Sequence, residues 1–165
     1  MNSTIEGFTN SFSDSGATAL SVFVAQNAGA GKKERAKKGF KEGMLLLCIS
    51  AVILGALMIL FTKPFLILLM GTPSVAVMES AKTYINIISV FYILCFMGSS
   101  FVGFYRGVGM VAVPVIGSTL QIAIRAVLSY LMISKFGLSA VAIATGIGWI
   151  AIVFFHTFIY KRKKY

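Results

Sequence analysis

The sequence predicts an all-α integral membrane protein with five transmembrane helices. Of its 165 residues, 58% are hydrophobic and 12% are charged, whereas soluble domains are about a quarter charged. Residues 43–62, 83–105 and 136–160 contain no charged residue, and residues 107–134 contain only Arg125. Each of these four segments reaches the roughly 20 apolar residues with which a helix crosses a bilayer.

Positive charge is concentrated in two segments. Residues 32–42 contain six basic and two acidic residues, and the tail 161–165 contains four basic residues. Because Lys and Arg are enriched at the cytoplasmic ends of transmembrane helices, both segments are predicted to be cytoplasmic. Charge in this position favours contact with anionic membrane lipid and argues against nucleic-acid binding, which needs a basic soluble face.

The first predicted helix, residues 4–28, is unusually polar for a membrane helix. Its polar side chains include Glu6, Asn10, Asp14 and Gln26. A helix of this kind is stable in a bundle when its polar face borders a water-filled cavity. The alternative is a disordered tail as far as about Ser15, followed by a shorter helix. Gly29 and Gly31 are predicted to end the helix, as glycine commonly does at a C-terminus.

A basic loop, residues 32–42, is expected to lead into the second helix, residues 40–62. Pro64 ends that helix, because the residue before a proline avoids helical geometry. The apolar residues 65–70 are too few to cross a membrane, so they are predicted to lie at the far interface.

The third predicted helix spans residues 73–105, with Thr72 as its N-cap and Pro73 at its first position. Short turns lead from it to the fourth helix, residues 111–134, and from there to the fifth, residues 138–160. The chain is therefore predicted to cross the membrane four times between the basic loop and the basic tail. Because four is an even number, both segments are predicted to lie on the same side of the membrane.

Ionisable groups at membrane depth are costly, so each is a candidate for function. Asp14 precedes Gln26 by twelve residues, or about 18 Å of helix, which puts it near the middle of the membrane. Asp14 is the first candidate for cation coupling, and Glu6, closer to the outer interface, is the second. A solvated carboxylate at a frayed helix end is the alternative for Asp14.

Other polar residues could line a cavity or hold helices together, and the sequence leaves these two roles open. They are Asn10, Gln26, Asn86, Tyr92, Gln121, Arg125 and Tyr130. Gln121 precedes Arg125 by one helical turn, so the two are expected within hydrogen-bonding reach. His156 is predicted to be a satisfied interfacial histidine. Gly103 and Gly107 have GxxxG spacing, a weak sign of helix packing.

No pattern of an enzyme is present, so the sequence predicts no catalytic residue, metal site or organic cofactor. Serine, histidine and aspartate do not occur in a catalytic arrangement, and the glycines of residues 29–31 follow a helix, whereas those of a phosphate-binding loop follow a strand. Cys48 and Cys95 lie inside hydrophobic segments and are expected to be packing residues.

Three segments, taken in order, resemble multidrug and toxic compound extrusion (MATE) transporters. FVAQNAGAGKKERAKKG, residues 23–39, resembles a helix end and the cytoplasmic loop after it. FYRGVGMVAVP, residues 104–114, is similar to the loop between the family's tenth and eleventh helices, and IAIRAVLSYLM, residues 122–132, to the eleventh helix. The resemblance identifies residues 1–165 as one partial C-terminal lobe, the last five of twelve helices.

This resemblance implies a multi-pass protein of the plasma membrane that exports organic, often cationic, compounds in exchange for protons or sodium ions. Its partners would be membrane lipid, a small organic substrate and the seven preceding helices of the same transporter. Some sodium-coupled members carry an aspartate where this chain has Cys95. The alternatives are a lipid-linked oligosaccharide flippase of related fold and a truncated, non-transporting fragment. A flippase would need a strongly basic cavity, whereas only Arg125 lies deep in a span.

Overall fold

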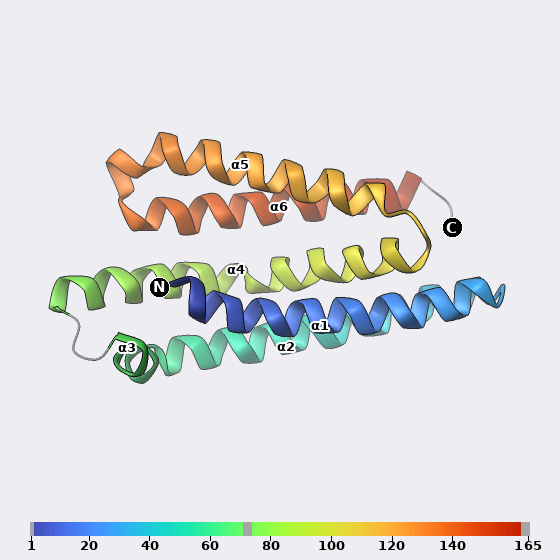
Figure 1. Cartoon of the computed structure of the whole chain (residues 1–165), viewed down its shortest axis with the longest axis horizontal. Helices are drawn as coiled ribbons and strands as arrows, with labels where there is room; N and C mark the ends of the chain where they lie inside the picture. Colours follow the sequence, from blue (N-terminus) through green and yellow to red (C-terminus); the bar gives the residue numbers. More distant parts are fainter. Residues whose placement is uncertain (1, 71–73, 163–165) are drawn as a thin grey trace.

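Within residues 2–70 and 74–162, which the computed structural model describes, the chain forms six helices (Figure 1). They are α1 (Asn2–Gly29), α2 (Lys33–Leu60), α3 (Thr62–Met70), α4 (Val75–Gly107), α5 (Ala112–Phe136) and α6 (Leu138–Arg162). The chain is therefore all-α, as predicted. Because α1 already begins at Asn2, the alternative of a disordered tail is excluded for residues 2–14.

Helix α4 is the central element of the bundle. It packs against α1 and α2 on one side and against α6 on the other, while α5 packs mainly on α6 as a hairpin. Helices α1, α4 and α6 run in one direction, and α2 and α5 run in the other (Figure 1). The face of α4 between α1 and the α5–α6 hairpin is thus left without a covering helix among the described residues.

Two glycines allow α1 and α4 to come into close contact. A Cβ atom added at Gly103 would overlap the carbonyl oxygen of Ala17, and one added at Gly107 would lie 2.7 Å from the carbonyl oxygen of Ser21. Small residues spaced by four let helix backbones approach in this way. The GxxxG spacing of Gly103 and Gly107 is therefore a packing motif between α1 and α4, and it fixes their relative register.

Two apolar clusters hold the helices around α4. One centres on Tyr92 and Phe96, both fully buried. The other joins the start of α2 to the ends of α4 and α6, since the Phe40 ring lies 4.6 Å from Phe104 and 5.4 Å from Tyr160 between centroids. This second cluster brings the basic segment of α2 and the basic end of α6 to the same end of the bundle.

Glycine ends α1 as predicted, and the geometry is that of a Schellman motif. Gly31 has φ +73. Its N–H donates to the carbonyl oxygen of Ala28 at 3.0 Å, and the N–H of Lys32 donates to that of Asn27 at 2.8 Å. These two bonds satisfy carbonyl groups that the end of a helix otherwise leaves unpaired.

The prediction of a loop over residues 32–42 is wrong, because α2 already begins at Lys33. This segment consists largely of good helix formers. Oppositely charged side chains one turn apart add to its stability, with Lys37 3.0 Å from Glu34 and Lys38 3.8 Å from Glu42. Pairs of this kind each stabilise an exposed helix by about 0.2–0.5 kcal/mol.

The chain breaks at Phe61, three residues before the expected position, and Pro64 lies in the first turn of α3. Proline is compatible with a first turn, whose N–H groups have no partner inside the helix. Helix α4 begins at Val75, and the predicted cap at Thr72 and Pro73 lies outside the described residues.

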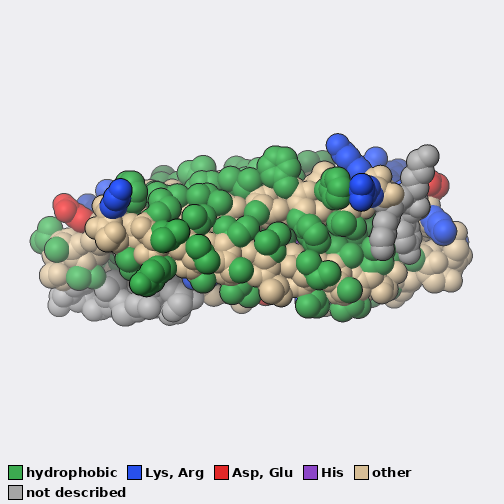
Figure 2. Space-filling view, turned by 90° about the horizontal axis from the view of Figure 1, so that it is seen from above, with side chains coloured by type: hydrophobic (Ala, Val, Ile, Leu, Met, Phe, Trp, Pro, Cys, Tyr) green, Lys and Arg blue, Asp and Glu red, His purple; other side chains and the backbone are tan. Residues whose placement is uncertain are grey.

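Four of the described helices, α2, α4, α5 and α6, are long and apolar enough to cross a membrane. Figure 2 shows hydrophobic side chains along the length of the bundle and Lys and Arg side chains near its two ends. Helix α1 is not among the four, since its polar residues lower its hydrophobicity. A fifth crossing by α1 remains a prediction that depends on its packing against α2 and α4.

The charge pattern predicts which end of the bundle is cytoplasmic. Single cysteines at Lys38 and Lys135, in a chain whose Cys48 and Cys95 have been replaced, would lie at opposite ends. A membrane-impermeant maleimide added to intact cells is expected to label position 135 and not position 38. Equal labelling of the two positions from outside would contradict this orientation.

Candidate functional site

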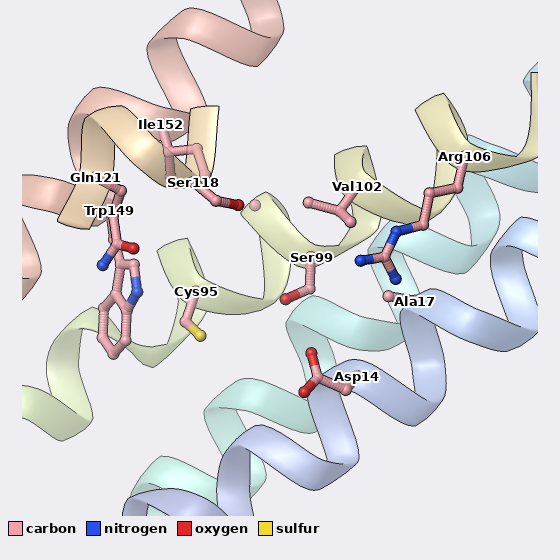
Figure 3. Close-up of a pocket in the computed structure, with 11 residues that line it drawn as sticks. Asp14, Ala17, Cys95, Ser99, Val102, Arg106, Ser118, Gln121, Trp149 and Ile152 are labelled. Atoms are coloured by element: carbon pink, nitrogen blue, oxygen red, sulfur yellow. The ribbon is translucent and has the colours of Figure 1, made fainter. Parts of the chain in front are cut away.

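A cavity of about 200 Å³ lies over the open face of α4, between α1 and the α5–α6 hairpin (Figure 3). Four helices contribute to it: α1 gives Asp14 and Ala17, α4 gives Cys95, Gly98, Ser99, Val102 and Arg106, α5 gives Ser118 and Gln121, and α6 gives Trp149 and Ile152. Charged, polar and apolar groups thus meet in one small space.

Helical periodicity explains how α4 forms the floor of this cavity. Residues 95, 99, 102 and 106 follow the three- and four-residue steps of a single helix face. An adjacent face of α4 carries Tyr92, Phe96 and Ser100, which are fully buried among the other helices. One face of α4 therefore belongs to the core of the bundle, and the face beside it belongs to the cavity.

The register of α1 and α4 sets Asp14 level with Ser99. Asp14 comes three residues before Ala17, and Ser99 comes four residues before Gly103. Since Ala17 contacts Gly103 and the two helices run in the same direction, Asp14 and Ser99 lie at the same height to within about one residue rise of 1.5 Å. In Figure 3 the Asp14 carboxylate is directed into the cavity toward Ser99.

Asp14 and Arg106 are the two charged residues that line the cavity. Both side chains are exposed to it, and no ion pair within 4.0 Å joins them in the described part of the chain. The cavity therefore contains one negative and one positive group that do not neutralise each other by direct contact. Such an arrangement can attract an ion of either sign, and most strongly at the group nearest to its charge.

Of the predicted polar residues, Gln121 also lines the cavity, where its side chain lies beside Trp149 (Figure 3). Asn10 does not line the cavity itself but contacts a residue that does, because the Cys95 thiol donates a weak hydrogen bond to Asn10 Oδ1 at 3.8 Å. Asn10 thus holds Cys95, which lines the cavity, against α1.

The remaining predicted residues are not among those that line this cavity. Tyr92 is fully buried and packs 6.0 Å from the Trp149 ring, so it serves helix packing. Four others have exposed side chains: Gln26, Asn86, Arg125 and Tyr130. Among the described residues no hydrogen bond joins Arg125 to Gln121, contrary to expectation. The side chain of Glu6 lies outside the described part.

Arg106, Ser118 and Trp149 line the cavity without having been selected from the sequence. Arg106 lies one residue before the end of α4, just beyond the predicted helix 73–105, where the sequence predicted a short turn. Ser118 and Trp149 carry no charge and match no motif. The signal that identifies them is the pairing of α5 with α6, which sequence periodicity does not provide.

His156 is also different from the prediction of a satisfied interfacial residue. It is fully buried between aromatic rings, and both ring nitrogens have no hydrogen-bond partner among the described residues. Its backbone carbonyl oxygen accepts a hydrogen bond of 2.7 Å from the Tyr105 hydroxyl, which ties α6 to α4. The imidazole occupies the space that a side chain at Gly117 of α5 would need.

This contact predicts that Gly117→Ala destabilises the α5–α6 hairpin. The added Cβ atom would lie 2.7 Å from His156 Nε2, and overpacking of this kind costs about 1–3 kcal/mol. Thermal unfolding in detergent measures the loss. In a His156→Ala background the same substitution should cost much less, because the ring that it displaces is absent. An equal loss in both backgrounds would contradict the proposed contact.

Among the described residues, no three His, Cys, Asp or Glu side chains come together in a way that could hold a metal ion. The groups of the cavity that can bind ions are therefore the Asp14 carboxylate and the Arg106 guanidinium, assisted by the hydroxyl and amide groups around them.

A family model described as MatE matches residues 2–131 of this chain. Among solved structures, the chain is similar to one described as "Crystal structure of MATE in the bent conformation", with a TM-score of 0.84 and 21% sequence identity. That match covers 92% of this chain and 34% of the other, so this chain spans about a third of the length of the solved protein. No curated protein matches by sequence.

Proposed function

Because this chain belongs to the MatE family, we propose that it forms part of a membrane transporter that exports organic compounds, cationic ones in particular, in exchange for protons or sodium ions. The observation that carries this proposal is the cavity between α1 and the α5–α6 hairpin, with the Asp14 carboxylate directed into it at mid-height of the bundle.

Asp14 is the residue to which we assign the exchange. An ionised carboxylate attracts a cation, and a protonated carboxyl group, which is neutral, does not. One carboxylate therefore holds either an organic cation or a proton. If the cavity opens to one side of the membrane with each occupant, movement of the proton inward drives movement of the organic cation outward.

The other residues of the cavity suit the body of an organic molecule better than a bare ion. Trp149 offers an aromatic face, Val102 and Ile152 offer apolar contacts, and Gln121 and Ser118 offer hydrogen-bonding groups. Small-molecule sites combine apolar contacts with a few placed polar groups, and this cavity supplies groups of both kinds. Aromatic rings also attract organic cations through their π electrons.

The open faces of the bundle support a role within a larger protein. Along α5 only Pro114 and Gly117 are buried, and the large apolar side chains on its surface include Val115, Ile116, Ile122, Val127, Leu131 and Ile133. Lipid can cover such an apolar face, but the hydrocarbon chains of lipid cannot form hydrogen bonds with the polar residues around Asp14. We propose that seven preceding helices of the same transporter close the cavity, in the plasma membrane and with the C-terminus in the cytoplasm.

A lipid-linked oligosaccharide flippase is the weaker alternative. Recognition of a pyrophosphate needs several basic groups, whereas this cavity has one arginine opposite one carboxylate. The other alternative, a fragment that does not transport, predicts no efflux from any membrane that contains the chain.

The test is efflux of a cationic dye such as ethidium from vesicles that contain the complete transporter. We expect efflux to follow an imposed pH gradient or sodium gradient, and the gradient that drives it identifies the coupling ion. Vesicles with no gradient and vesicles without protein are the controls. Gradient-independent leakage equal to that of empty vesicles would exclude the proposed function.

A further inference from the structure

The side chain of Arg106 does not point in the direction expected from its position near the end of α4. It lies one residue before the end of α4, at the end of the bundle where the basic segments gather. A long basic side chain near the end of a membrane helix ordinarily extends outward to water and lipid headgroups. In Figure 3 the guanidinium instead turns back along α4 into the cavity, on the side where the Asp14 carboxylate lies.

The register of the helices makes this approach possible. Gly107 contacts Ser21, so Arg106 is level with residue 20 of α1, six residues beyond Asp14. This corresponds to about 9 Å along the helix axis. Side chains on a helix lean toward its N-terminus, which for α4 is the direction of Asp14. An extended arginine side chain covers most of this distance.

Among the described residues, no charged group other than Arg106 lines the cavity with Asp14. Helix α2, which packs beside α1, has no charged residue over 43–62, and α6 has none over 138–160. On α5 the one charged residue before Lys135 is Arg125, which is exposed and is not among the residues that line the cavity. Arg106 is therefore the cation that the fold brings to this carboxylate, at a separation that leaves space between them.

Resting on the proposed function, we propose that Arg106 is the internal counter-ion of Asp14 and competes with the organic cation for its carboxylate. When the site is empty, the guanidinium partly compensates the charge of Asp14, which would otherwise be the one charge among the described residues that line the cavity. An arriving organic cation must displace this interaction, so Arg106 weakens substrate binding and eases release. Arg106 is thus a positioning residue, which affects substrate binding through its interaction with Asp14.

The test is a double-mutant cycle on ethidium binding to the complete transporter, measured by fluorescence polarisation. Arg106→Gln is expected to tighten binding roughly five-fold, the size of one charge interaction in a partly hydrated site. Arg106→Lys should bind like the parent, since it keeps the charge. Arg125→Gln is the matched control, an intramembrane arginine outside the cavity, and should leave binding unchanged.

Asp14→Asn should weaken binding, and in that background Arg106→Gln should produce no further tightening, because the group for which the two cations compete is gone. Tightening of the same size in both backgrounds would overturn the proposal, since Arg106 would then repel the dye without involving Asp14. Equal affinities for Arg106→Gln and the parent would overturn it as well.

A second cycle separates failure of this inference from failure of the proposed function. Thermal unfolding of the parent, Asp14→Asn, Arg106→Gln and the double variant needs no substrate. Non-additive changes in melting temperature are expected if the two charges interact. If ethidium does not bind but the unfolding cycle shows coupling, the transport proposal fails and the charge pair stands. Additive changes would overturn the pair itself.

Discussion

Replacing Asp14 by asparagine is expected to abolish efflux driven by a gradient. Asparagine keeps the size of the side chain and its ability to form hydrogen bonds, but it cannot alternate between a charged and an uncharged form. A cavity whose carboxylate is permanently neutral has no group on which a proton and an organic cation can be exchanged. In vesicles that contain the complete transporter, the rate should fall to that of vesicles without protein.

Two control variants sharpen this result. Asp14→Glu keeps the charge and should retain part of the gradient-driven rate. Glu79→Gln removes a carboxylate that is exposed near the start of α4 and does not line the cavity, so the rate should be unchanged. Parent-like efflux in Asp14→Asn would assign the coupling to another residue, most simply in the rest of the transporter.

Gly103→Ala is expected to destabilise the bundle, although alanine is the better helix former. The added methyl group would overlap the carbonyl oxygen of Ala17, and backbone atoms cannot rotate away as a side chain can. Helices α1 and α4 must therefore separate. We expect a loss of about 1–3 kcal/mol from overpacking, in spite of the roughly 1 kcal/mol by which alanine favours the helix.

Gly98→Ala, in the same helix, is the matched control. A Cβ atom there would lie 3.5 Å from Ile152 Cγ2, an ordinary van der Waals contact. The gain in helix propensity is the same at both positions, so a difference between the two variants measures the α1–α4 contact alone. Thermal unfolding in detergent gives this difference. Equal melting temperatures would show that α1 and α4 are not packed as closely as described.

The sequence predicted the helical architecture well where the chain itself carries the signal. The long uncharged segments predicted the four apolar helices, and Gly31 predicted the end of α1. Both features could be predicted because they depend on local chemistry alone. The basic residues after Gly31 misled the prediction, since charge suggested a loop although the residue types favour helix. Here the ion pairs of Lys37 with Glu34 and of Lys38 with Glu42 add to the stability of the charged helical segment.

The candidate site was predicted in part. Asp14 and Gln121 were singled out because a carboxylate or amide inside a membrane helix needs a partner. Whether such a residue faces a cavity or a packed interface depends on the rotation of each helix about its axis. The predictions therefore placed Tyr92, which is buried, in one group with Tyr130, which is exposed.

By itself the sequence determined that this chain is a helical membrane protein, where its charged segments lie along the chain, and that a carboxylate lies midway along a polar helix. Only the tertiary structure decided that Arg106 shares a cavity with Asp14. The reason is that 92 residues separate them in the chain. Their proximity depends on the parallel packing of α1 and α4, which the glycines at 103 and 107 permit and which no local pattern specifies.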